Sequence, residues 1–159
     1  MDIKRRRILM SNSHIESIDI NNYLTMKALE DEFTASFTNT IEYCVNGDGN
    51  WQTLNAGEST TAINYNETLS FRGNITPVKS EFTGSGTFTT NKSFDLLGNC
   101  GSILYGDNAA DVSKIAAYAF CSLFNDAKVN HVADDFLPSF VLYSIYILFF
   151  LLITLICIL

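Results

Sequence analysis

The chain has 159 residues and a net charge of −7, and four of its ten basic residues, Lys4 to Arg7, stand together near the N-terminus. Residues 8–135 therefore carry 6 basic and 16 acidic side chains, a net charge of −10. An acidic domain of this kind repels phosphate backbones, which argues against nucleic acid as a partner. The length allows one domain with additional segments at its ends.

Residues 1–20 are predicted to form a basic and polar N-terminal tail. The run Lys4–Arg7 is typical of a solvated tail, although it could also contact anionic lipid or nucleic acid. Only Ile8, Leu9 and Met10 follow it before the sequence becomes polar, whereas a secretory signal needs about 7–15 apolar residues. The sequence therefore predicts no signal peptide.

Apolar and polar residues alternate from residue 22 to about residue 97, which is typical of antiparallel strands separated by turns. The strongest turn signal is Asn46–Asn50, since glycine and asparagine tolerate positive φ angles. We predict an immunoglobulin-like antiparallel β-sandwich over residues 21–98. Its expected strands lie at residues 24–28, 33–37, 41–45, 51–54, 69–72, 87–90 and 94–97.

The pattern changes after Gly98. Apolar residues recur at helical spacing and predict a short helix from about residue 113 to 126, with Ser113 as its N-cap. Residues 129–136 are expected to be extended, and Pro138 ends the regular structure. The sequence thus predicts a helix and a strand over residues 99–138, outside the sandwich.

The last segment, Phe140–Leu159, contains no charged residue, no proline and no glycine. As a helix it would be roughly 30 Å long, which matches the hydrocarbon thickness of a bilayer. We therefore predict a C-terminal transmembrane helix over residues 139–159 and a membrane-associated or surface location. The alternatives are a segment produced by a shifted reading frame and a buried hydrophobic hairpin.

The four cysteines, Cys44, Cys100, Cys121 and Cys157, show no CxxC pairing and no neighbouring histidine. We expect four free thiols. A bridge between Cys44 and Cys100 stays open, because spacing alone does not determine pairing.

The sequence predicts no catalytic, cofactor-binding or metal-binding residue, and no enzyme. The run from Asn46 to Asn50 resembles a calcium loop, but Trp51 and Gly57 stand where an EF-hand needs glycine and glutamate. The two histidines, His14 and His131, have no neighbours that suggest a metal site or a catalytic triad.

Trp51 is the one candidate ligand contact. A lone tryptophan in a strand usually belongs to the core, and we expect its indole ring to be largely buried. The alternative is that the ring is exposed at the edge of the hairpin and stacks on a sugar.

Several stretches resemble the BspA-like leucine-rich repeat surface proteins of gut Bacteroidetes and their phages. The most specific are the EYxxxGxGNW hairpin at residues 42–51, the FRGN strand end at 71–74 and the junction LLGNCGSILYGDNAAD at 96–111. Further matching stretches lie at residues 24–39, 86–89, 117–124 and 134–138. The resemblance implies a small N-terminal sandwich, a first partial repeat over residues 99–138, and a non-enzymatic surface or virion protein that binds a partner.

The chain departs from that family in two places. After Leu123 and Phe124 the family expects Asn-Cys-Thr, whereas this chain has Asn125-Asp126-Ala127. After Pro138 the repeats should continue, but the apolar segment follows instead. A stacked array needs about three repeats to bury its faces, so a single repeat cannot form the family's binding surface.

Two hypotheses follow for the function. The first is a binding or adhesion module for an unknown protein or glycan, tethered to a membrane through Phe140–Leu159. The second is a truncated or frameshifted remnant of a longer repeat adhesin, without a function of its own. Repeat motifs in another reading frame of the downstream DNA would favour the remnant.

Overall fold

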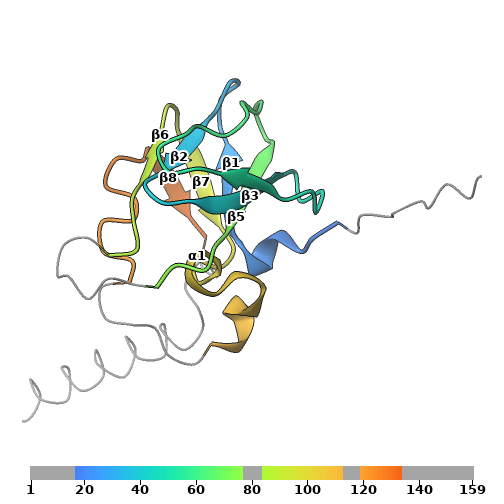
Figure 1. Ribbon diagram of the computed structural model, residues 1–159. Helices are drawn as coiled ribbons and strands as arrows, with labels where there is room; N and C mark the ends of the chain where they lie inside the picture. Colours follow the sequence, from blue (N-terminus) through green and yellow to red (C-terminus); the bar gives the residue numbers. More distant parts are fainter. Residues whose placement is uncertain (1–16, 77–83, 113–118, 134–159) are drawn as a thin grey trace, which may run out of the picture.

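The computed structural model describes residues 17–76, 84–112 and 119–133, which form a mainly β structure with one short α-helix (Figure 1). The elements in chain order are η1 (Ile20–Asn22), β1 (Leu24–Ala28), β2 (Ala35–Phe37), β3 (Ile41–Val45), β4 (Gln52–Leu54), β5 (Thr68–Arg72), β6 (Phe88–Thr90), β7 (Phe94–Leu97), α1 (Ser102–Tyr105), η2 (Gly106–Asp111) and β8 (Val129–Val132). Six strands form one sheet in the order β4-β3-β5-β1-β7-β8, and β2 pairs with β6 in a second sheet.

The alternation of apolar residues fixes the inner face of the six-stranded sheet. In its centre, β1 pairs antiparallel with β5 and β7, so that Met26 lies opposite Leu69 on one side and Leu96 on the other. All three side chains are buried. A shift of one residue would turn this apolar set towards water, so the hydrophobic pattern pins the register.

The two-stranded sheet covers this inner face with aromatic side chains. Phe88 of β6 lies between Phe37 of β2 and Phe71 of β5, with ring centroids 4.3 Å and 5.0 Å away. Phe33, just before β2, packs against Phe94 of β7 at 5.6 Å. The core is therefore the layer between the two sheets, and large buried rings dominate it.

The N-terminal segment covers part of the outer face. Thr25 and Ser70 point outward from neighbouring strands, yet both are fully buried and their hydroxyls lie 2.8 Å apart. Thr25 also donates to the carbonyl of Ile20, and the Ile18 amide donates to the carbonyl of Gly47. These bonds satisfy the buried polar groups and hold the segment across the sheet.

The expected strands are confirmed, including the hairpin at residues 46–50, where Asn46, Gly47 and Gly49 have positive φ angles. Two features differ from the expected immunoglobulin-like arrangement. The strands divide six and two, whereas an immunoglobulin constant domain divides four and three. The sheet is also mixed, because β8 returns to the edge of β7 and pairs parallel to it.

The predicted helix over residues 113–126 is wrong in its described part, since residues 119–125 form turns. Ser122 has a φ of 59°, which ends a right-handed helix. The carbonyls of Ala119 and Leu123 accept hydrogen bonds from Ser85 and Phe88 instead of from the next helical turn. Residues 113–118 lie outside the described residues. The first part of the predicted extended segment is confirmed as β8.

The predicted tail and transmembrane segment, residues 1–16 and 139–159, also lie outside the described residues. Within the described ranges, no helix is both long enough and apolar enough to cross a bilayer. Cys44 and Cys100 are buried free thiols, so the possible bridge between them is absent. Burial raises the pKa of the Cys100 thiol to about 12, which keeps it protonated and unreactive.

Candidate functional site

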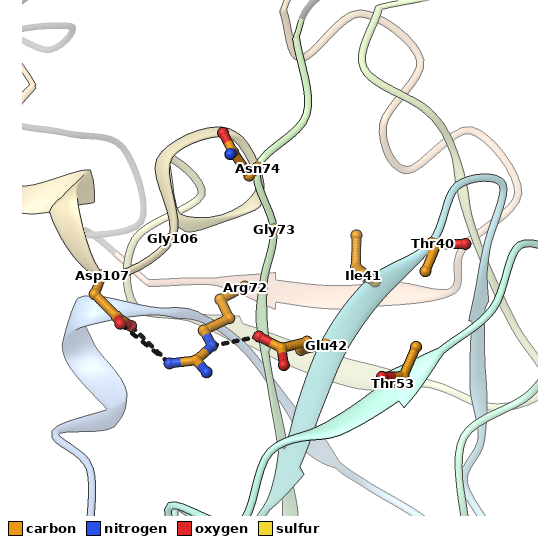
Figure 2. A pocket seen from close by; sticks show the side chains of 9 residues that line it. All are labelled: Thr40, Ile41, Glu42, Thr53, Arg72, Gly73, Asn74, Gly106 and Asp107. Carbon is orange, nitrogen blue, oxygen red and sulfur yellow. Dashed lines mark hydrogen bonds and ion pairs between the residues drawn. The ribbon is translucent and has the colours of Figure 1, made fainter.

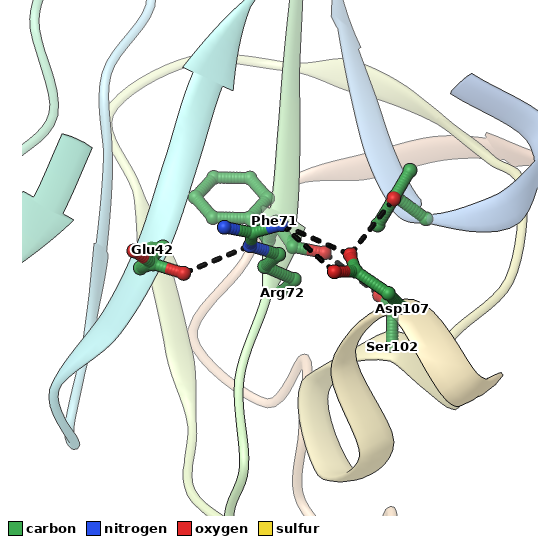
Figure 3. Close-up of polar contacts among 6 residues, drawn as sticks. Glu42, Phe71, Arg72, Ser102 and Asp107 are labelled. Carbon is green, nitrogen blue, oxygen red and sulfur yellow. Dashed lines mark hydrogen bonds and ion pairs between the residues drawn. The ribbon is translucent and has the colours of Figure 1, made fainter. Parts of the chain in front are cut away.

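The only arginine in the described ranges, Arg72, lies at the end of β5 and bonds to carboxylates from two other elements, β3 and η2 (Figure 3). The β3–β5 register places Glu42 directly opposite Arg72. The guanidinium Nε donates to Glu42 Oε2 at 2.8 Å, and Nη1 donates to both carboxylate oxygens of Asp107 in η2, at 2.9 and 3.1 Å. One cation is thus shared by two carboxylates.

Two aromatic rings complete this cluster. The guanidinium carbon of Arg72 lies 4.2 Å from the centroid of the Trp51 ring, a cation–π contact. Tyr23 packs against Trp51 with centroids 5.0 Å apart, and its hydroxyl donates to Asp107 Oδ1 at 2.9 Å. Burial and the bond to Asp107 raise the pKa of Tyr23, so the hydroxyl stays a donor at neutral pH.

The pKa of Arg72 reflects a balance between burial and its two partners. Partial burial alone would lower the pKa of the guanidinium. The hydrogen bonds to Glu42 and Asp107 outweigh that effect and raise it. The guanidinium is therefore a permanent cation whose charge is offset by two carboxylates.

The helix α1 brings Asp107 to Arg72. The fully buried Ser102 hydroxyl donates to the carbonyl of Phe71 at 2.7 Å and accepts from the Leu24 amide at 2.8 Å. The amide of Gly73 donates to the carbonyl of Ser102, also at 2.8 Å. A Cβ atom at residue 73 would lie 2.5 Å from the carbonyl oxygen of Ile103, so only glycine permits this close approach.

A surface pocket of about 430 Å³ opens beside the Arg72 cluster, between the ends of β3, β4 and β5 and the start of η2 (Figure 2). Its volume is in the range common for small-molecule sites. The two glycines in its wall contribute backbone without side chains. The lining residues are Thr40, Ile41, Glu42, Thr53, Arg72, Gly73, Asn74, Gly106 and Asp107.

Polar groups with unused hydrogen-bonding capacity face this pocket. Thr40, Thr53 and Asn74 are exposed, and their side chains form no hydrogen bond with any described residue. Glu42 binds Arg72 through Oε2 alone, which leaves Oε1 without a partner in the described ranges. The pocket therefore offers two hydroxyls, a carboxamide and a carboxylate oxygen to a ligand.

Trp51, the predicted ligand contact, lies next to the pocket and is not among its lining residues. Its expected burial in the core is wrong, because the ring is only partly buried and stacks with Arg72 on the outer face of the sheet. Direct contact between Trp51 and a ligand stays a prediction. His131 is exposed on β8 and distant in sequence from the cluster, and His14 lies outside the described residues.

Arg72, Glu42 and Asp107 are not among the site residues predicted from the sequence. One signal was available, since Arg72 is the only arginine between residues 8 and 159 and stands at a strand end in an acidic domain. Asp107 could not be found, because its position depends on a tertiary contact of α1. Among the described residues, no group of three histidines, cysteines or carboxylates could hold a metal ion.

The comparisons with known proteins give no relative from which a function could be transferred. No protein-family model, no curated protein and no solved structure is significantly similar to this chain.

Proposed function

We propose that this protein is a non-enzymatic binding module for a glycan, held at a membrane or virion surface by its C-terminal segment. Hydroxyl, carboxamide and carboxylate groups around an open pocket are suited to a ligand rich in hydroxyl groups. The two carboxylates of the site are paired with Arg72.

The single observation that carries this proposal is that Thr40, Thr53, Asn74 and Glu42 line one pocket with polar atoms that have no partner among the described residues. Polar side chains in a folded protein bond mostly to the backbone or to water. The Arg72 guanidinium and the Asp107 carboxylate, in contrast, already bond to each other. The unused groups at the rim are therefore available to a ligand.

The tether is part of the same proposal. The composition of Phe140–Leu159 supports a transmembrane helix, and the resemblance to BspA-like proteins supports a surface location. We also propose that residues 99–138 are a rudimentary repeat cap on a sandwich-like domain. The parallel pairing of β8 with β7 supports it, since stacked repeats continue a parallel sheet.

A glycan array probed with the full-length protein in detergent micelles tests the proposal. We expect binding to a subset of glycans, weakened about tenfold by Asn74→Ala together with Thr53→Ala, because two hydrogen bonds are lost. Thr89→Ala is the matched control, since Thr89 is exposed on β6 and does not line the pocket. If wild type binds no glycan, or if Thr89→Ala weakens binding as much as the double variant does, the proposed function is contradicted.

A further inference from the structure

The charges around the pocket are unequally exposed, and this bears on which glycans it accepts. The side chain of Arg72 is 23% exposed, whereas those of Glu42 and Asp107 are 44% and 62% exposed. The cation is thus the most buried of the three groups. A ligand entering from solvent meets the carboxylates first.

The positive charge of Arg72 is also offset by its carboxylate partners. Its Nε and Nη1 atoms donate to Glu42 and Asp107, and the Trp51 ring covers one face of the guanidinium. An anionic group that approached the remaining donors of Arg72 would lie beside these two carboxylates, which already offset the charge of the guanidinium.

Among the described residues, no other cation lines the pocket. Its lining carries two carboxylates and one guanidinium, a net charge of −1. The described ranges as a whole contain four basic and twelve acidic residues, so the surrounding field is negative as well. An anionic ligand would be repelled both locally and at long range.

We propose that the pocket selects uncharged or amino-bearing sugars and excludes sugars that carry a carboxylate or a sulfate. This inference rests on the proposed glycan-binding function and names its ligand class. An amino group gains attraction to Glu42 and can donate to Oε1, while neutral hydroxyls bond to Thr40, Thr53 and Asn74.

The test uses matched methyl glycosides of glucose, galactose and mannose in their neutral, amino and uronic acid forms. Within each set, the amino form and the uronic acid form each differ from the neutral sugar in one substituent. The comparison therefore measures how the charge of the sugar affects its affinity. Calorimetric titration of the full-length protein in detergent should show the uronic acid form binding about tenfold or more weakly than the other two. Glu42→Gln keeps the side-chain size and removes one charge. It should reduce the ratio between the affinities for the neutral and the uronic acid forms about threefold.

The salt dependence of binding is a second test, and it uses only the wild-type protein. The carboxylates are exposed, so raising the salt concentration should strengthen binding of the uronic acid form and leave the neutral form unchanged. Equal or tighter binding of the uronic acids would overturn this inference while leaving the proposed function intact. Absence of binding to every sugar here and on the array would overturn both.

Discussion

Trp51 is held by two neighbours of different chemistry, the Arg72 guanidinium over its ring and the tilted ring of Tyr23. Tyr23 and Arg72 both donate to Asp107, so four side chains from separate parts of the chain form one closed cluster. Each contact is modest on its own because the cluster is partly exposed. Together they fix the wall of the pocket.

Replacement of Trp51 by alanine should destabilise the protein by about 1–3 kcal/mol, from lost ring packing and the cation–π contact. Denaturant unfolding of wild type and variant measures the difference. Tyr65→Ala is the control, because Tyr65 is 58% exposed and its loss should change the stability by less than about 0.5 kcal/mol. A loss above about 4 kcal/mol would place Trp51 in the core.

Glu67 provides a prediction about pH. Its carboxylate accepts from the Asn64 amide at 2.6 Å and from the Asn46 side chain at 3.1 Å, and these bonds lower its pKa. A lowered pKa contributes stability above the ordinary value of 4.5, and that stability is lost as pH falls through the lower value. Glu67→Gln should therefore destabilise the protein at neutral pH and lose its effect in acid.

Urea unfolding midpoints of wild type and Glu67→Gln, measured from about pH 3 to about pH 7, check this. The gap between the two proteins should widen as pH rises. A difference in midpoint that stays constant over the whole pH range would show that the charge of the Glu67 carboxylate does not stabilise the loop.

The face on which Trp51 lies could have been read from the sequence. Side chains alternate along a strand, so residues separated by an odd number of positions point to opposite faces. Trp51 and Leu54 are three apart and cannot both reach the core, and Leu54 is the buried one. The ion pair of Arg72 could not be read in this way, since it depends on strand pairing.

At the level of elements, the strands were predictable and the helices were not. Period-two alternation marks each strand directly, and Phe33, Ala35 and Phe37 are all buried as expected. The helix α1 has only four residues, which is too few to show a helical period or to be stable alone. It exists because Ser102 and Gly73 bind it to the ends of β1 and β5.

Ser102→Ala tests this anchoring. The change leaves the Leu24 amide and the Phe71 carbonyl without their buried partner, and each buried polar group left unpaired costs about 1–3 kcal/mol. Thermal or denaturant unfolding should show a clear loss of stability, while Ser59→Ala, at an exposed position, should show almost none. Equal effects of the two variants would mean that Ser102 does not anchor the helix.

At the scale of the whole molecule, charge and hydropathy are separated along the chain. The described ranges are strongly acidic, whereas Phe140–Leu159 carries no charge. An acidic domain is repelled by anionic lipid headgroups. A tether at its C-terminus would therefore present the domain to the solvent rather than to the membrane surface.

We predict that Phe140–Leu159 anchors the protein in membranes. Wild type should resist carbonate extraction, whereas Leu148→Arg should be partly released, because arginine near the centre of a span costs about 2.5–3.5 kcal/mol on insertion. Ser144→Ala is the control and should remain in the membrane. A wild-type protein that carbonate extracts completely would contradict the anchor.

Mapping the contact by NMR shows whether the pocket beside Arg72 binds a glycan. A neutral sugar selected by the array is titrated into isotopically labelled full-length protein, and the amide chemical shifts are followed by NMR. The largest shifts should occur at Thr40, Thr53, Asn74 and Gly106 and should saturate together, because these residues line one pocket. Largest shifts at the distant strands β6 and β8, with an unchanged Asn74 side-chain amide, would contradict the claim.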